Sequence, residues 1–121
     1  MDDQPMTRSG AMRGIDKAQW KDLCDRLSRI LVGKRAEIEA ASLALGDQIE
    51  AEWVPLIGIV YDPKDDLIEI ALEGVDHLIP HPLELAIQEG PGGIASILVV
   101  DADGTQQIIH FRESLLLPRP A

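Results

Sequence analysis

The stretch IDKAQWKDLCDRLSRILVG, residues 15–33, decides how the fold begins. Its apolar side chains recur at the i, i+3, i+4, i+7 spacing of one helical face, and Asp16 and Gln19 have the spacing of a capping box. Opposite charges four residues apart, including Asp22 and Arg26, lie on the other side, and the final glycine suits a helix end. The stretch therefore predicts an amphipathic helix that packs on the rest of the chain.

After Gly33 the apolar period changes from 3.6 to 2, which predicts successive strands joined by tight turns. Breaker clusters such as Gly90-Pro91-Gly92-Gly93 separate them. We expect an α+β fold: one N-terminal amphipathic helix packed on a twisted, mainly antiparallel sheet of five to six strands. Because each strand connects to the next by a short loop, the expected topology is a meander that curls towards a barrel.

The 121 residues fit one domain, which we expect over residues 15–118. Residues 1–14 mix Gly, Ser, Thr, Pro and charge without periodicity and are predicted to form a flexible tail, and residues 119–121 a short C-terminal tail. No apolar run approaches the roughly 20 residues that span a bilayer, and no targeting signal is visible at the N-terminus. We therefore expect a cytoplasmic protein.

The first hairpin has a register that the sequence can predict. A two-residue loop at Gly46-Asp47 would place Ala40 opposite Trp53, so that small side chains leave room for the indole. Pro55 should bend the second strand, because proline cannot donate to a ladder.

The last hairpin turns at Asp103-Gly104, a strong hairpin signal. Pairing about a two-residue loop there would place Leu98 opposite Ile109 and leave both faces of the strand apolar. Such a strand needs cover on both faces, by the helix on one side and by sheet curvature or a second subunit on the other. This motivates the hypothesis of a homodimer.

The charge distribution limits the partners. The net charge is −10, with +3 in residues 1–35 and −13 in residues 36–121. Nucleic-acid binding needs many Lys and Arg residues, with aromatic platforms for single strands, and the chain has four aromatic residues. Neither nucleic acid nor an anionic membrane surface is therefore expected as a partner.

No catalytic constellation is recognisable. His77, His81 and Asp76 are weak candidates for a metal site, because their spacing matches no ligand motif, and no metal or cofactor is predicted. Asp101-Ala102-Asp103-Gly104 opens like a calcium loop but lacks its later ligands, so it is interpreted as a turn. Cys24 lies on the apolar helical face, where cysteine is usually a small buried hydrophobe.

A small-molecule pocket is the second hypothesis. The space between the helix and a curved sheet could bring together the aromatic and histidine side chains Trp20, Trp53, Tyr61 and His81.

The runs PLIGIVYDPKDDLIEIALEGVDHLIPHP, residues 55–82, and VVDADGTQQIIHF, residues 99–111, resemble a bacterial family of small cytoplasmic domains of unknown function. The likeness covers residues 15–118 and implies a small domain of helix and sheet. It carries over no catalytic residue, cofactor or substrate.

The leading hypothesis is therefore a non-enzymatic interaction or accessory module that binds itself as a homodimer or binds another protein. The alternatives are a small-molecule-binding domain and, less favoured by the sequence, a metal-dependent enzyme.

Overall fold

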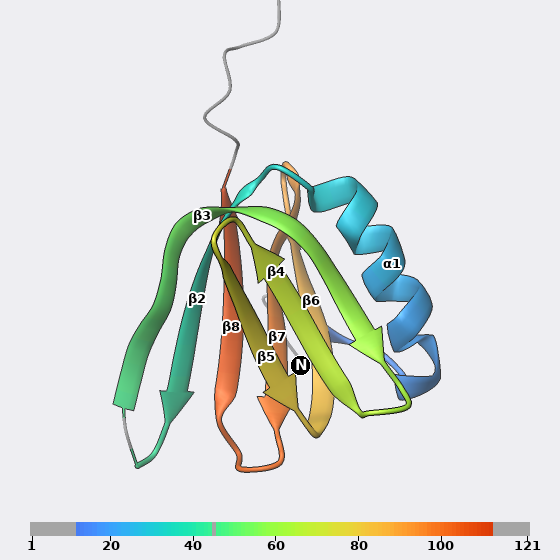
Figure 1. Ribbon diagram of the computed structural model, residues 1–121, viewed down its shortest axis with the longest axis vertical. Coiled ribbons are helices and arrows are strands. Elements are labelled where there is room, and N and C mark those ends of the chain that lie inside the picture. The colour runs from blue at the N-terminus through green and yellow to red at the C-terminus, as the bar shows by residue number, and fades with distance from the viewer. Residues whose placement is uncertain (1–11, 45, 113–121) are drawn as a thin grey trace, which may run out of the picture.

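The computed structural model describes residues 12–44 and 46–112 of the chain. Most of this part is antiparallel sheet, with one 12-residue α-helix preceded by a 3₁₀ turn (Figure 1). The elements are β1 (Met12–Gly14), η1 (Lys17–Gln19), α1 (Trp20–Leu31), β2 (Arg35–Ser42), β3 (Gly46–Asp62), β4 (Leu67–Leu72), β5 (Val75–Pro80), β6 (Pro82–Gly90), β7 (Gly93–Asp101) and β8 (Gln106–Arg112). No helix in this part is long and apolar enough to cross a membrane.

One sheet of eight strands, in the order β1-β6-β7-β8-β2-β3-β4-β5, folds back on itself. The 17-residue strand β3 pairs with β2 through its first part and with β4 through its second. Figure 1 shows β3 arching over one end, so that β4 and β5 lie in front of β6, β7 and β8. A single residue, His81, separates β5 from β6, although β5 is last in the order and β6 second.

The predicted sheet of five to six strands in a meander is therefore wrong. The chain forms two meanders, β2 to β5 and β6 to β8, which join where β8 pairs with β2. The two further strands are β1 and β5. Strand β5 keeps its ladder with β4 because Pro80 lies at its last position. Of the predicted tail 1–14, residues 12–14 form β1; residues 1–11 and 113–121 lie outside the described residues.

The predicted register of the first hairpin is also wrong. Ala40 pairs with Gln48, and Ser42 with Gly46, so the loop spans three residues and Gly46-Asp47 belongs to β3. Two further register shifts, typical of β-bulges, lie between Ala36 and Ile38 and between Ile38 and Glu39. Trp53 has φ +53° and lies where the ladder with β2 shifts register, two residues before Pro55, where a bend was expected.

The register of the last hairpin differs by one residue from the prediction: Leu98 pairs with Ile108 and not with Ile109. The loop has three residues rather than two: the Asp101 backbone N–H donates to the Thr105 carbonyl at 3.0 Å, and Gly104 has φ +83°. The Asp101 carboxylate accepts the N–H groups of Asp103 and Thr105. A three-residue loop with a left-handed glycine is the next most common hairpin after the two-residue turn.

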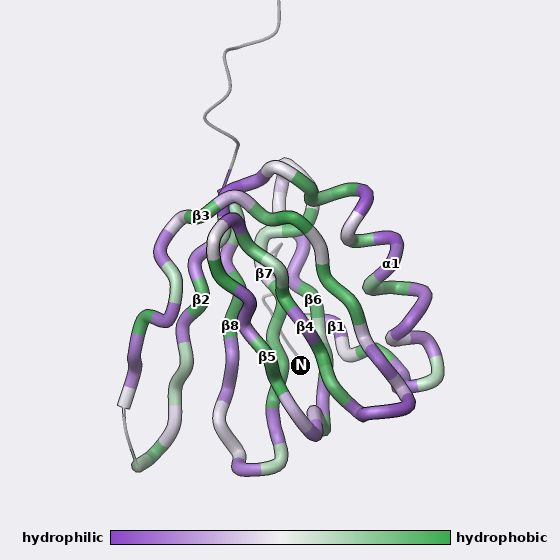
Figure 2. Tube along the Cα trace, in the orientation of Figure 1, coloured by the Kyte–Doolittle hydropathy of each residue, from purple (hydrophilic) through white to green (hydrophobic). Residues whose placement is uncertain are grey.

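The core lies between the two layers and α1. Figure 2 shows hydrophobic and hydrophilic residues alternating along the strands and around the helix. The predicted apolar face of the helix is buried except at Ile30, which is 56% exposed. The predicted cap is absent, because Asp16 makes no side-chain hydrogen bond to the backbone and precedes a 3₁₀ turn. The buried apolar side chains are Trp20, Leu23, Cys24, Leu27 and Leu31 from the helix and, from the sheet, Ala36, Ile38, Leu56, Ile59, Tyr61, Ile68, Ile70, Leu72, Ile79, Leu85, Ile87, Ile97, Val99 and Ile109.

Helix α1 covers the edge of β3 that β2 leaves open. The Ser28 hydroxyl donates to the Ile59 carbonyl at 2.6 Å and accepts the Ile59 N–H at 2.7 Å. Near the bend, the Leu56 N–H donates to the Lys34 carbonyl, and the Gly33 N–H donates to the Leu56 carbonyl, both at 2.9 Å. A Cβ on Gly58 would lie 3.4 Å from the Ser28 hydroxyl, which is van der Waals contact, so the helix packs closely on this part of β3. These contacts satisfy backbone groups that would otherwise be orphaned.

Ser28→Ala should therefore lower the free energy of unfolding by about 1–3 kcal/mol, because it leaves a donor and an acceptor of Ile59 without partners. Urea unfolding followed by circular dichroism measures the change. Lys21→Ala on the exposed side of the same helix is the control and should cost under about 0.5 kcal/mol, since it removes one surface ion pair. Equal losses in the two variants would contradict the edge-covering role of Ser28.

Candidate functional site

The fold gathers polar side chains around the Asp66 carboxylate, at the turn between β3 and β4. Tyr61 donates its hydroxyl to Asp66 Oδ1 at 2.7 Å, and Lys17 Nζ lies 3.2 Å from the same oxygen. His81 Nδ1 lies 3.7 Å from Oδ2. The carboxylate thus ties the start of the helical region, the end of β3 and the β5–β6 connection together.

The backbone at this junction is unusual. Asp66 has φ +51° and His81 has φ +52°, a left-handed conformation that is uncommon for residues other than glycine. The His81 N–H donates to the Asp66 carbonyl at 2.8 Å, which fixes the two residues against each other. A left-handed backbone costs free energy and persists only where the surrounding structure holds it in place. Here His81 is held because it alone connects β5 to β6.

Three of the four predicted ligand-binding residues come together here. The rings of Trp20 and Tyr61 meet edge to face with centroids 5.2 Å apart, and His81 reaches the same Asp66. Trp20 and Tyr61 are only 1% and 4% exposed, so their rings fill the space between helix and sheet. Trp53 lies elsewhere, at the bend of β3, where the Arg112 guanidinium is 3.6 Å from its ring centroid.

The electrostatics of the Asp66 cluster follow from these contacts. The hydrogen bond from Tyr61, followed by the proximity of Lys17, lowers the pKa of Asp66 below its ordinary value of 3.8. Burial, together with the Asp66 carboxylate, raises the pKa of Tyr61 to about 12. The cluster therefore holds a carboxylate and a neutral phenol across the physiological range.

The weak metal candidates are not brought together. Asp76 and His77 are neighbours on β5 and point to opposite faces, while His81 contacts Asp66. Within residues 12–44 and 46–112 there is no group of three or more His, Cys, Asp or Glu side chains placed to hold a metal ion. Cys24 is buried, and burial raises the pKa of its thiol to about 12.

A second polar chain, which sequence reasoning missed, links the two layers. His77 Nε2 lies 2.8 Å from Gln107 Oε1, and Gln107 Nε2 donates to Asp101 Oδ2 at 3.3 Å. Because β5 and β8 are not sheet neighbours, local sequence signals could not place His77 beside Gln107. Residue identity offered one signal: a histidine and a glutamine among apolar inward-facing positions need polar partners.

A third cluster, also missed, lies on the outer face of β2, β3 and β8. His110 Nε2 is 3.2 Å from Glu39 Oε1, and Glu39 neighbours Asp47. A hydrogen bond with Asp47 and then the contact with His110 lower the pKa of Glu39, while the same carboxylate raises the pKa of Asp47. This cluster depends on the β2–β8 pairing, which no turn signal in the sequence reveals.

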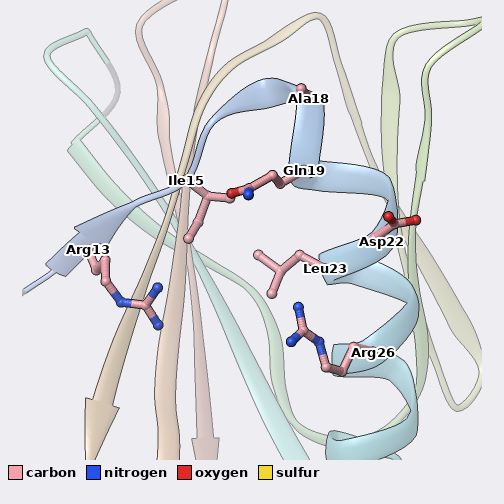
Figure 3. Close-up of a pocket in the computed structure, with 7 residues that line it drawn as sticks. All are labelled: Arg13, Ile15, Ala18, Gln19, Asp22, Leu23 and Arg26. Atoms are coloured by element: carbon pink, nitrogen blue, oxygen red, sulfur yellow. The ribbon is translucent and has the colours of Figure 1, made fainter.

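The fold also leaves a hollow of about 300 Å³ between β1 and the start of α1 (Figure 3). Figure 3 shows the guanidinium groups of Arg13 and Arg26 pointing into the space between strand and helix, with Ile15 and Leu23 beside them and the Asp22 carboxylate directed away. The lining residues are Arg13, Ile15, Ala18, Gln19, Asp22, Leu23 and Arg26.

These features define a small, folded-back antiparallel sheet protein with one covering helix. The chain belongs to the family of unknown function DUF5335, whose model matches residues 11–120. It is similar to an uncharacterized protein of Aquifex aeolicus (strain VF5), with 42% identity over 109 residues that cover 89% of this chain and 98% of the relative. No solved structure matches the chain. The resemblance to a bacterial family of unknown function is thereby confirmed.

Tyr61→Phe should raise the pKa of Asp66 towards 3.8, because it removes the hydroxyl that donates to the carboxylate. The lowered pKa of Asp66 stabilises the wild-type fold above about pH 3.8, and this stabilisation is lost as the pH falls through the pKa of the folded state. The difference in free energy of unfolding between the wild type and Tyr61→Phe should therefore become smaller in acid. A carboxyl ¹³C titration by NMR, with thermal unfolding at several pH values, measures both effects.

Asp65→Asn is the matched control, since this exposed carboxylate lies in the same turn and makes no contact with Tyr61. The control should leave the titration of Asp66 unchanged. An Asp66 pKa that is the same in Tyr61→Phe and in the wild type would contradict the account of the cluster.

Proposed function

We propose that this chain is a non-enzymatic interaction module that forms a homodimer by antiparallel pairing of β5 with β5 of a second copy. The observation that carries the proposal is that β5 ends the strand order, with no described strand on its outer side. An open edge presents unpaired N–H and C=O groups, which template the addition of another strand.

The geometry of the β4–β5 hairpin defines which groups are open. Leu72 pairs with Val75 across the two-residue turn Glu73-Gly74. Because hydrogen bonding alternates along an antiparallel ladder, the backbone groups of Asp76 and Leu78 face away from β4. Pro80, which has no N–H, limits the pairing segment to the residues before it.

Apolar side chains support association at this layer. On the outer face of β3, β4 and β5, Ile57, Val60 and Leu78 are 58%, 47% and 52% exposed. The solvent face of an antiparallel sheet is usually polar, so three large exposed apolar side chains on one layer favour a binding surface there. Leu78 lies on β5 itself, so its burial beside a paired strand would add a hydrophobic contribution to the backbone hydrogen bonds.

Charge favours edge pairing over face stacking for a second copy. Strands β4 and β5 carry the acids Glu69 and Asp76 and no lysine or arginine, so two such faces stacked together would oppose like charges. Antiparallel edge pairing can place Asp76 opposite the partner's Leu78 and so avoid the contact between acids. The arrangement is two-fold symmetric, as most homodimers are.

Leu78→Pro should convert the dimer to a monomer, because it removes an outward N–H that β4 does not use; proline is tolerated on edge strands at such positions. Leu78→Ser is the matched variant: it removes the apolar side chain but keeps the N–H, so it should weaken the dimer without abolishing it. Native mass spectrometry and light scattering at tens of micromolar protein measure the mass, and circular dichroism checks that each variant folds.

Amide hydrogen exchange tests the same edge without a variant. The N–H groups of Asp76 and Leu78 should be protected at high protein concentration and exchange faster on dilution. A wild-type protein that is monomeric at tens of micromolar, or a dimer whose Asp76 and Leu78 amides exchange freely, would refute the proposal.

A further inference from the structure

We propose that the hollow between β1 and α1, the arginine pocket, binds a small organic anion. Its carboxylate or phosphate group would lie between Arg13 and Arg26, and its apolar part against Ile15 and Leu23. The inference does not depend on the dimer, because β1 and β5 lie at opposite ends of the strand order.

The two guanidinium groups converge from different elements. Arg13 comes from the edge strand β1, which pairs with β6, and Arg26 comes from the second turn of α1 (Figure 3). Pairing and helix formation hold their backbones in place, and both side chains point into the same space. Guanidinium groups present forked donors that match the oxygens of carboxylates and phosphates.

Within the described residues, the protein leaves one of the two arginine charges at the pocket without an ion pair and gives the other an exposed one. Arg26 has no ion-pair partner among residues 12–44 and 46–112, and Asp22, four residues before it, points away (Figure 3). Arg13 meets Glu89 at 3.2 Å, but both side chains are 61% exposed, and such a pair is weak enough for a bound anion to displace. The pocket is thus an electropositive site in a chain with net charge −10.

The walls set the class of ligand. Ile15, Ala18 and Leu23 form an apolar side, and the Gln19 side chain adds an amide next to Ile15 (Figure 3). A space of about 300 Å³ holds roughly ten non-hydrogen atoms, given that each water occupies about 30 Å³ in the liquid. These features fit a small carboxylic acid or phosphate ester with a hydrophobic portion better than a bare inorganic ion.

Titration of ¹⁵N-labelled protein with benzoate and with phenyl phosphate tests the pocket by NMR. Both should shift the amide resonances of Ile15, Gln19 and Leu23 with saturation, whereas benzyl alcohol, which lacks the charge, should bind at least about tenfold more weakly. Inorganic phosphate distinguishes an anion site from an organic-anion site and should bind more weakly than phenyl phosphate.

Arg26→Gln should weaken benzoate binding about tenfold or more, because it removes a charged hydrogen-bond donor. Arg29→Gln is the matched control: it removes the same charge from the same helix outside the pocket and should change affinity less than twofold. Binding that both variants weaken equally would mean general attraction to a basic helix and would overturn the proposal. So would the absence of saturable shifts at Ile15, Gln19 and Leu23 in the wild type.

Discussion

The structure depends on one strand that belongs to two layers. Strand β3 pairs with β2, bends near Trp53, and then pairs with β4, so the ladder continues while its direction changes. After the bend, one edge of β3 has no neighbouring strand. Helix α1 and the segment that follows it supply the missing partners through Ser28, Gly33 and Lys34. Without these hydrogen bonds the second layer would expose an unsatisfied edge in the interior of the protein.

The polar clusters are consequences of this folding back. Because β5 lies over β8, His77 contacts Gln107. The β3–β4 turn meets η1 and the β5–β6 connection, which places Asp66 beside Lys17 and His81. These groups satisfy one another between or beside the layers, which gives them structural roles. The two surfaces that we propose bind partners lie outside the core: the open edge of β5, and the arginine pocket at the other end of the strand order.

Local signals in the sequence predicted local structure well. The apolar spacing from Trp20 to Leu31 places the helix correctly, and Asp103-Gly104 does lie in a hairpin turn. The predicted register failed at both hairpins because it depended on where the loop lies and how long it is. At the last hairpin one extra loop residue moves each cross-strand pair by one position. At the first hairpin the loop is at residues 43–45 and not at Gly46-Asp47, so the partner of Ala40 is Gln48 and not Trp53. The preference for Asn or Asp followed by Gly could not distinguish a two-residue loop from a three-residue loop closed by the Asp101 carboxylate.

The order of the strands could not be predicted from the sequence, because it depends on pairing between strands far apart in the chain. No residue in β2 signals that β8 will be its neighbour, so the eight-stranded order and the Glu39–His110 contact could not be predicted. The convergence of Trp20, Tyr61 and His81 was predicted from chemistry alone, whereas Trp53 was misplaced by the bend in β3. The arginine pocket needed β1, which lies in a stretch that lacks the alternation of a strand.

The central claim is that the sheet folds back so that β5 lies over β8. The most direct test is a nuclear Overhauser measurement between the imidazole protons of His77 and the side-chain amide of Gln107, whose polar atoms lie 2.8 Å apart. The account predicts a cross-peak between the two side chains. Its absence in a fully assigned spectrum of the folded protein would show that β5 does not cover β8 and would contradict the folded-back sheet.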